Sequence, residues 1–159
     1  MRTLLLTLCA ASVAVSCGGS EGGAPEAVVV ELTGNDQMQY NKTALTVPAG
    51  ATVTVKLSNI GSMPKEAMAH NFVLLASGVT AMDFGGACAQ PDSGATVETH
   101  YIPTKESLVA QIVAYTTDQA GPGETVEVTF TAPDTPGTHE YVCTFPGHFA
   151  VMRGVLTVQ

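Results

Sequence analysis

The sequence predicts an all-β sandwich of seven or eight strands. Hydrophobic residues make up 45% of the 159-residue chain and charged residues 13%, with 16 glycines, 9 prolines and no tryptophan. This composition favours a turn-rich β fold over a helical bundle. Short apolar or alternating runs, separated by turn-forming residues, recur from residue 27 to the C-terminus. Because this length suits one core, we expect residues 27–159 to form a single domain with Greek-key connections.

The first sixteen residues, "MRTLLLTLCAASVAVS", are typical of an export signal. Arg2 is followed by an apolar run too short to span a bilayer and then by small residues. The segment "AVSC", residues 14–17, resembles the lipobox of bacterial lipoproteins, in which the cysteine becomes the lipidated N-terminus. Two interpretations stay open: a lipid anchor on Cys17, or plain secretion with an incidental cysteine. With a lipid anchor, residues 17–26 would be the lipidated N-terminus and a flexible Gly-rich linker. The exported domain would lie in the periplasm or on the outer side of the cell envelope.

Each expected strand is a run rich in β-branched residues and bounded by turn chemistry. Alternation is clearest where Val126, Val128 and Phe130 share one face while threonines and a glutamate share the other. The expected strands are 27–32, 52–59, 70–76, 108–116, 124–132, 137–144 and 154–159.

Residues 78–105 break this series because they are rich in glycine and proline and lack a strand pattern. A structureless loop of that length is unusual in a compact domain. We therefore expect a flap that contains a short helix starting near Thr80.

Three soft ligand types lie close together near the C-terminus, in "CTFPGHFAVM", residues 143–152. Cys143, His148 and Met152 offer a thiolate, an imidazole and a thioether, a set that suits copper and suits neither calcium nor magnesium. A blue copper site has two histidines and a cysteine with a weak axial methionine, so it needs one more histidine. His139 lies too far along the same strand to reach that ion. His70 opens an apolar strand and is the candidate.

Three segments resemble azurins and the related auracyanins, which are small blue copper proteins. They are "GNDQMQYN" (34–41), "GSMPKEAMAHNFVL" (61–74) and "CTFPGHFAVMRGVLTV" (143–158). The resemblance implies a cupredoxin-like Greek-key sandwich with a helix-bearing flap, which shuttles single electrons. It also implies copper ligation by His70, Cys143 and His148, with Met152 as the distant axial sulfur.

Further roles follow from the same resemblance. The backbone carbonyl of Ala69, where azurins usually have glycine, would approach copper weakly. Asn71 would support the cysteine loop, and the backbone N–H of Phe145 would donate to the thiolate. His148 would present its ring edge within an apolar docking surface. Three methionines either ring that edge or fill the core: Met38, Met63 and Met68.

The leading hypothesis is a monomeric, membrane-tethered blue copper protein that carries electrons and is not an enzyme. Its partners would be c-type cytochromes or membrane oxidase or reductase complexes of a respiratory or photosynthetic chain. The formal charge of −8 argues against nucleic acid, because no basic stripe could neutralise phosphates. The alternatives are a copper chaperone or storage module and a metal-free adhesion domain.

Cys88 is expected to have no intramolecular disulfide partner, because Cys9 would leave with the signal, Cys17 would carry the lipid and Cys143 would bind the metal. It is either a buried, inert thiol or a link between two molecules. We expect His100 to be an ordinary surface or strand residue.

Overall fold

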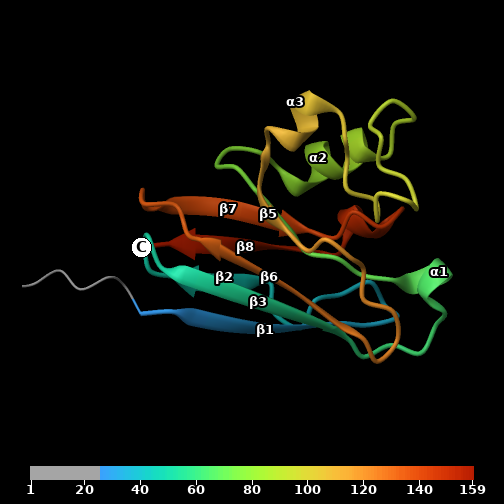
Figure 1. The fold of residues 1–159 in the computed structure, drawn as a ribbon, viewed down its shortest axis with the longest axis horizontal. Helices are drawn as coiled ribbons and strands as arrows, with labels where there is room; N and C mark the ends of the chain where they lie inside the picture. Colours follow the sequence, from blue (N-terminus) through green and yellow to red (C-terminus); the bar gives the residue numbers. More distant parts are fainter. Residues whose placement is uncertain (1–25) are drawn as a thin grey trace, which may run out of the picture.

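The structure is a computed structural model that describes residues 26–159. Eight strands form two sheets that face each other, which confirms the predicted all-β sandwich (Figure 1). The export signal, Cys17 and most of the linker lie outside the described residues. The elements in chain order are β1 (Val28–Gly34), β2 (Ala44–Val47), β3 (Thr52–Asn59), α1 (Lys65–Met68), β4 (Val73–Leu75), α2 (Ala81–Cys88), α3 (Glu106–Val109), β5 (Ile112–Tyr115), β6 (Thr125–Thr131), β7 (Gly137–Val142), the 3-10 helix η1 (His148–Ala150) and β8 (Arg153–Val158).

The strands divide into a three-stranded sheet, β1-β3-β6, and a five-stranded sheet, β2-β8-β7-β4-β5. β1 pairs in parallel with β3, and β2 pairs in parallel with β8. The chain therefore crosses to the opposite sheet between β1 and β2 and returns before β3. The main core lies between the sheets, where every second residue of β3 is buried. The predicted inner face of β6 is confirmed, because its two valines and its phenylalanine pack against this core.

Two predicted strands differ from the structure, and one observed strand is missing from the prediction. The segment 70–76 is a strand only over β4, and His70 lies outside both sheets, where it forms an isolated antiparallel bridge with Ala120. The segment 108–116 begins in helix α3 and becomes a strand only at β5, because Leu108 turns into a second core. Strand β2 was not predicted; it has four residues and ends directly before Pro48.

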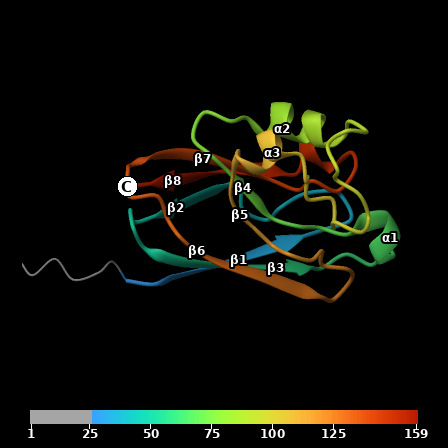
Figure 2. The same cartoon turned by 45° about the horizontal axis from the view of Figure 1, so that its top comes forward.

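The flap between β4 and β5 contains the predicted helix. α2 begins after Thr80, whose side chain accepts a hydrogen bond from the Asp83 N–H at 3.1 Å, a typical N-cap arrangement. With α3, it covers the outer side of β7 and β4 and encloses the second core (Figure 2). Within residues 26–159 no helix is long and apolar enough to cross a membrane.

The two ends of the sandwich differ. β1, β3 and β7 all run toward the same end, where α1 and the turn between β7 and β8 lie (Figure 1). The start of β1 and the C-terminus lie at the opposite end. The turns that carry the candidate ligands are thus gathered far from the point where the described chain begins.

Candidate metal centre

Three side chains from two distant parts of the chain meet at this end of the sandwich. One ligand atom from each of His70, Cys143 and His148 lies within 4.8 Å of the other two, and all three residues are buried. The Cys143 Sγ is 3.6 Å from the His148 Nδ1. The imidazole rings of His70 and His148 lie 5.2 Å apart between centroids. The structure therefore brings together the three residues that the sequence proposed as metal ligands.

His70 is held by both its backbone and its ring. Its backbone N–H and C=O pair with Ala120 at 3.1 and 2.7 Å, and its Nε2 lies 3.1 Å from the Asn35 carbonyl. Because a carbonyl can only accept, Nε2 carries the proton and Nδ1 keeps its lone pair. This Nδ1 is buried and has no hydrogen-bond partner among the described residues. An unpaired buried nitrogen is costly, so its orientation fits a metal ligand.

The turn from Cys143 to Met152 is closed by its own backbone. Gly147 has a φ of 85°, in the left-handed region that glycine tolerates, so the chain reverses before His148. The Phe145 carbonyl accepts from the His148 N–H at 3.0 Å, and the Met152 carbonyl accepts from the Cys143 N–H at 3.0 Å. These bonds fix the spacing between the thiol and the imidazole.

Met152 reaches the same centre and is fully buried. A Cβ built on Gly34 would lie 2.8 Å from the Met152 Cε and 2.6 Å from the His70 Cδ2. The thioether end of Met152 and the ring of His70 therefore both pack on the end of β1. Sequence reasoning missed the roles of Gly34 and Asn35, although both lie in the segment "GNDQMQYN" that carried part of the resemblance.

Burial sets the charge of the donors. Desolvation raises the pKa of the Cys143 thiol to about 12, although the backbone N–H groups of Asn71 and Phe145 act in the opposite direction. Desolvation also lowers the pKa of His148 to about 4, and lowers that of His70. Without metal the site is therefore neutral at pH 7. A metal cation would have to displace the thiol proton to gain its thiolate ligand.

The two residues that follow the ligands hold their loops together. The Asn71 Oδ1 accepts from the Thr144 N–H at 2.9 Å, and the Asn71 Nδ2 donates to the Thr144 Oγ1 at 2.8 Å. These bonds confirm the predicted support of the cysteine loop by Asn71. Ala69, the residue before His70, is fully buried. Its weak carbonyl contact with a metal stays a prediction.

The other histidines lie outside the centre. The His139 Nδ1 lies 2.9 Å from the Leu75 carbonyl, and the His100 Nδ1 lies 3.2 Å from an Asp118 carboxylate oxygen. Cys88 is a free, buried thiol whose pKa burial raises to about 12. This agrees with the inert alternative rather than with an exposed link.

The predicted docking surface is less open at His148 than expected, because only 2% of that residue is exposed. The three methionines differ. Met38 packs against the main core, Met63 is 40% exposed and Met68 is half-buried. Their place around His148 stays a prediction.

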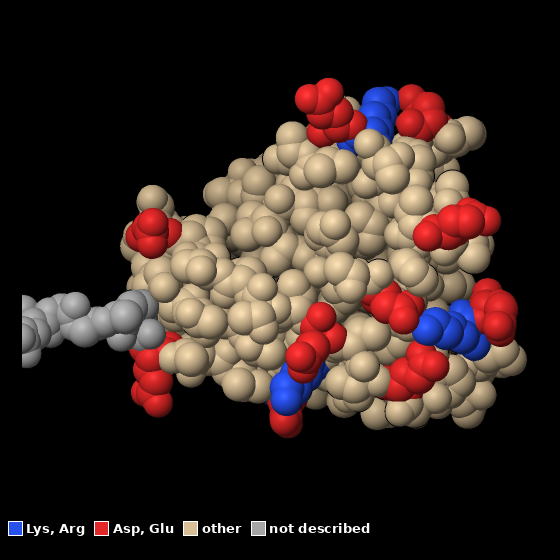
Figure 3. Space-filling view, viewed as in Figure 1, with Lys and Arg blue, Asp and Glu red and all other residues tan. Residues whose placement is uncertain are grey.

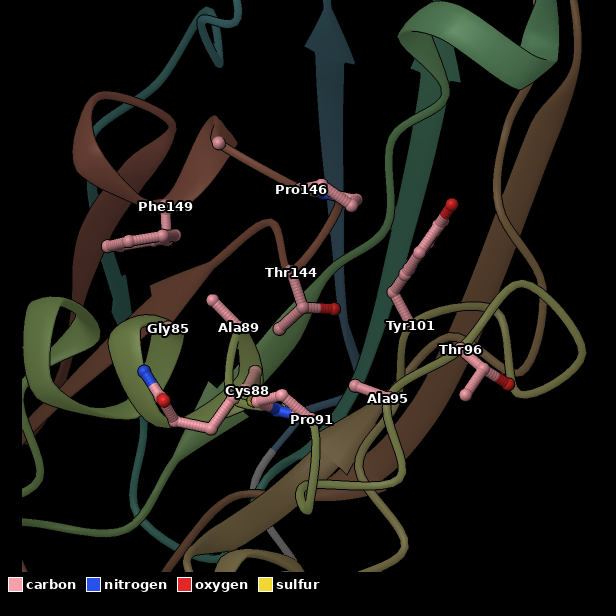
Figure 4. A pocket seen from close by; sticks show the side chains of 12 residues that line it. Gly85, Cys88, Ala89, Pro91, Ala95, Thr96, Tyr101, Thr144, Pro146 and Phe149 are labelled. Atoms are coloured by element: carbon pink, nitrogen blue, oxygen red, sulfur yellow. The ribbon is translucent and has the colours of Figure 1, made fainter.

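A cavity of about 290 Å³ lies beside the ligand turn, between the flap and residues 144–149. Figure 4 shows Phe149 on one side of this cavity and Tyr101 on the other, with Thr144 and Pro146 between them. Gly85 of α2 has no room for a Cβ, because that atom would lie 2.3 Å from the Phe149 Cβ. The flap therefore packs directly against the ligand turn.

Known proteins with this arrangement bind copper. A family model described as "Copper binding proteins, plastocyanin/azurin family" matches residues 26–159. Auracyanin-A of Chloroflexus aurantiacus is 33% identical over 170 residues, which cover 100% of this chain and 96% of that protein. Azurin of Pseudomonas aeruginosa is 36% identical over 133 residues, which cover 82% and 97%. Among solved structures, auracyanin A, described as a "blue" copper protein, has a TM-score of 0.68 at 35% identity and covers 82% of this chain and 98% of its own.

Proposed function

This chain belongs to the plastocyanin/azurin family of copper-binding proteins, and we propose that it is a type 1 copper protein that carries single electrons and is not an enzyme. The observation that carries this proposal is the buried meeting of His70, Cys143 and His148. Two imidazoles and a thiolate with a weak axial thioether are the donor set of electron-transfer copper sites. Met152 would hold the metal weakly through its thioether sulfur, and Ala69 would offer a weak contact through its backbone carbonyl.

Copper in such a site supplies one-electron chemistry by alternating between Cu(II) and Cu(I). The protein keeps its donors in fixed positions, so that little has to move when the charge changes. Asn71 and Thr144 tie the two ligand segments together, and Asn35 fixes the ring of His70. The three donors and Met152 are buried, so water is largely excluded from the centre.

The proposed partners are c-type cytochromes or membrane oxidase or reductase complexes, which would dock at the end of the sandwich that carries His148. The described chain begins at the opposite end (Figure 1), so an N-terminal lipid anchor would leave this end free to meet a partner. On the face shown in Figure 3, acidic side chains lie mainly around the periphery and basic ones are few. The mature protein would be exported, monomeric and anchored at the cell envelope through Cys17.

A copper chaperone is the second candidate, since it would use a similar soft ligand set. A chaperone has to exchange its metal, which favours exposed donors. Here Cys143 and Met152 are fully buried and His148 is 2% exposed, which favours a carrier. Voltammetry of the copper-loaded protein distinguishes the two. A fast, reversible one-electron wave supports the carrier, whereas rapid transfer of the metal to a chelator without such a wave would support the chaperone.

A further inference from the structure

Three aromatic rings form a continuous series from the flap to the metal centre. The ring of Tyr101 meets that of Phe145 edge-on, with centroids 5.2 Å apart and planes at 66°. The ring of Phe145 in turn lies on the imidazole of His148, with centroids 4.6 Å apart. Contacts of this kind favour defined ring orientations as well as burying area. A flap residue far away in sequence is thus only one ring from a proposed ligand.

The backbone that presents Tyr101 is held in an unfavourable conformation. His100 and Tyr101 have φ values of 52° and 58°, in the left-handed region that non-glycine residues seldom adopt. The His100 carbonyl accepts from the Asn71 Nδ2 at 3.2 Å and from the Gln119 Nε2 at 3.1 Å, and the Tyr101 N–H donates to the Thr96 carbonyl at 2.7 Å. The amide that clamps the cysteine loop therefore also holds the turn that carries Tyr101.

Tyr101 lines two cavities. One is the 290 Å³ cavity beside the ligand turn, where Figure 4 shows its side chain. The other has a volume of about 270 Å³, and its wall also includes Phe145. Removing the Tyr101 ring would open this side of Phe145 to solvent. Phe145 affects two ligands at once, because its N–H interacts with the Cys143 sulfur and its ring contacts His148.

We propose that Tyr101 is a positioning residue of the metal centre: its ring holds Phe145, and through Phe145 it holds the Cys143 sulfur and the His148 imidazole in place. The proposal rests on the proposed function only for the identity of the bound metal. It gives the flap a role in the metal centre, although none of the three ligands belongs to the flap.

The test compares Tyr101→Leu, which removes the ring, with Tyr101→Phe, which keeps it. Tyr115→Leu is the matched control, because Tyr115 is a partly exposed residue of β5 and takes part in none of the ring contacts found within residues 26–159. Two quantities are measured: the rate at which Cu(II) leaves the loaded protein in excess EDTA, and the NMR line width of the His148 ring in the metal-free protein. Tyr101→Leu should release copper about tenfold faster than the control, a difference of about 1.4 kcal/mol in the activation free energy of release. It should also broaden the His148 signals. Tyr101→Phe should behave as wild type.

Equal rates and unchanged His148 signals in Tyr101→Leu and Tyr115→Leu would overturn the proposal. So would a Tyr101→Phe variant as impaired as Tyr101→Leu, because the hydroxyl and not the ring would then matter. If Tyr101→Leu does not fold, Gln119→Met replaces it, since that change removes one bond to the His100 carbonyl. It should also speed copper release, and a wild-type rate would count against the proposal. The NMR measurement needs no metal, so it decides this question even if the site proves not to be of type 1.

Discussion

Asn71 and Thr144 form a two-bond clamp directly behind the metal centre. The Thr144 N–H donates to the Asn71 Oδ1 at 2.9 Å, and the Asn71 Nδ2 donates to the Thr144 Oγ1 at 2.8 Å, both within the buried core. Because Asn71 follows His70 and Thr144 follows Cys143, this clamp sets the separation of two ligands. Rigidity of the site is therefore built into side chains that do not touch the metal.

Replacing Asn71 tests the clamp. Asn71→Ala should lower the free energy of unfolding of the metal-free protein by about 2 to 3 kcal/mol, because it leaves buried groups of Thr144 unpaired. Urea unfolding measures this. Asn41→Ala is the control, since the Asn41 Oδ1 accepts one bond from the Thr33 N–H at the surface and should cost under about 1 kcal/mol. Similar losses in both variants would contradict the account.

Gly34 leaves space for two site residues at the end of β1. In Gly34→Ala the new Cβ would lie 2.6 Å from the His70 ring and 2.8 Å from the end of Met152, so these side chains have to move. We expect a loss of about 1 to 3 kcal/mol in stability, together with weaker copper binding in a competition titration. Gly137→Ala is the control because nothing lies within 4 Å of its Cβ. Unchanged copper affinity in Gly34→Ala would show that the close packing is not needed.

The metal-free protein should lose stability as the pH falls. Burial lowers the pKa of His148 to about 4, below the value of about 6.5 in an unfolded chain. The unfolded state therefore binds more protons between these values, and the stability that is complete above about pH 6.5 falls by about 3 kcal/mol by about pH 4. The lowered pKa of His70 acts in the same direction. Urea unfolding from pH 7.5 to 4 measures the slope.

His148→Gln is the matching variant, because it removes the group that titrates. Its unfolding free energy should depend on pH much less steeply than that of the wild type over the same range. A wild-type slope in this variant would assign the effect to other groups.

Copper uptake at pH 7 should release about one proton. The Cys143 thiol is protonated in the metal-free protein because burial raises its pKa to about 12, whereas His148 is already neutral. Calorimetric titration in buffers of different ionisation enthalpy gives the number of protons per copper. Cys143→Ser should release close to none. Two or more protons in the wild type would mean that a histidine also enters the reaction in its charged form.

Much of the fold follows from local patterns, and the missed parts depend on distant pairing. The alternation in β6 predicts its inner face because side chains of a strand point to opposite sides in turn. The four residues of β2 are too few for such a signal, and their pairing with β8 lies more than a hundred residues away. The apolar run 108–116 fits a helix or a strand equally well, and only contact with the flap core divides it into α3 and β5.

The sequence also predicts only part of the candidate metal centre. The spacing of Cys143, His148 and Met152 within one turn is visible in the sequence, and the resemblance to azurins supplies His70. The contribution of Gly34 cannot be predicted from the sequence, because it depends on the absence of a side chain. Two side chains that are distant in sequence, those of His70 and Met152, pack where a Cβ of residue 34 would lie. The hydrogen bond from the His70 ring to the Asn35 backbone carbonyl likewise cannot be predicted, because every residue type has that carbonyl.

The measurement that tests the central claim most directly is a Cu(II) titration of the metal-free protein followed by its visible spectrum. The account predicts an intense blue thiolate charge-transfer band that saturates at one copper per chain. The band should be absent from Cys143→Ser, whose fold circular dichroism would verify. A colourless copper complex of the wild type, or a blue band that survives Cys143→Ser, would contradict the claim that Cys143 forms a type 1 copper site with His70 and His148.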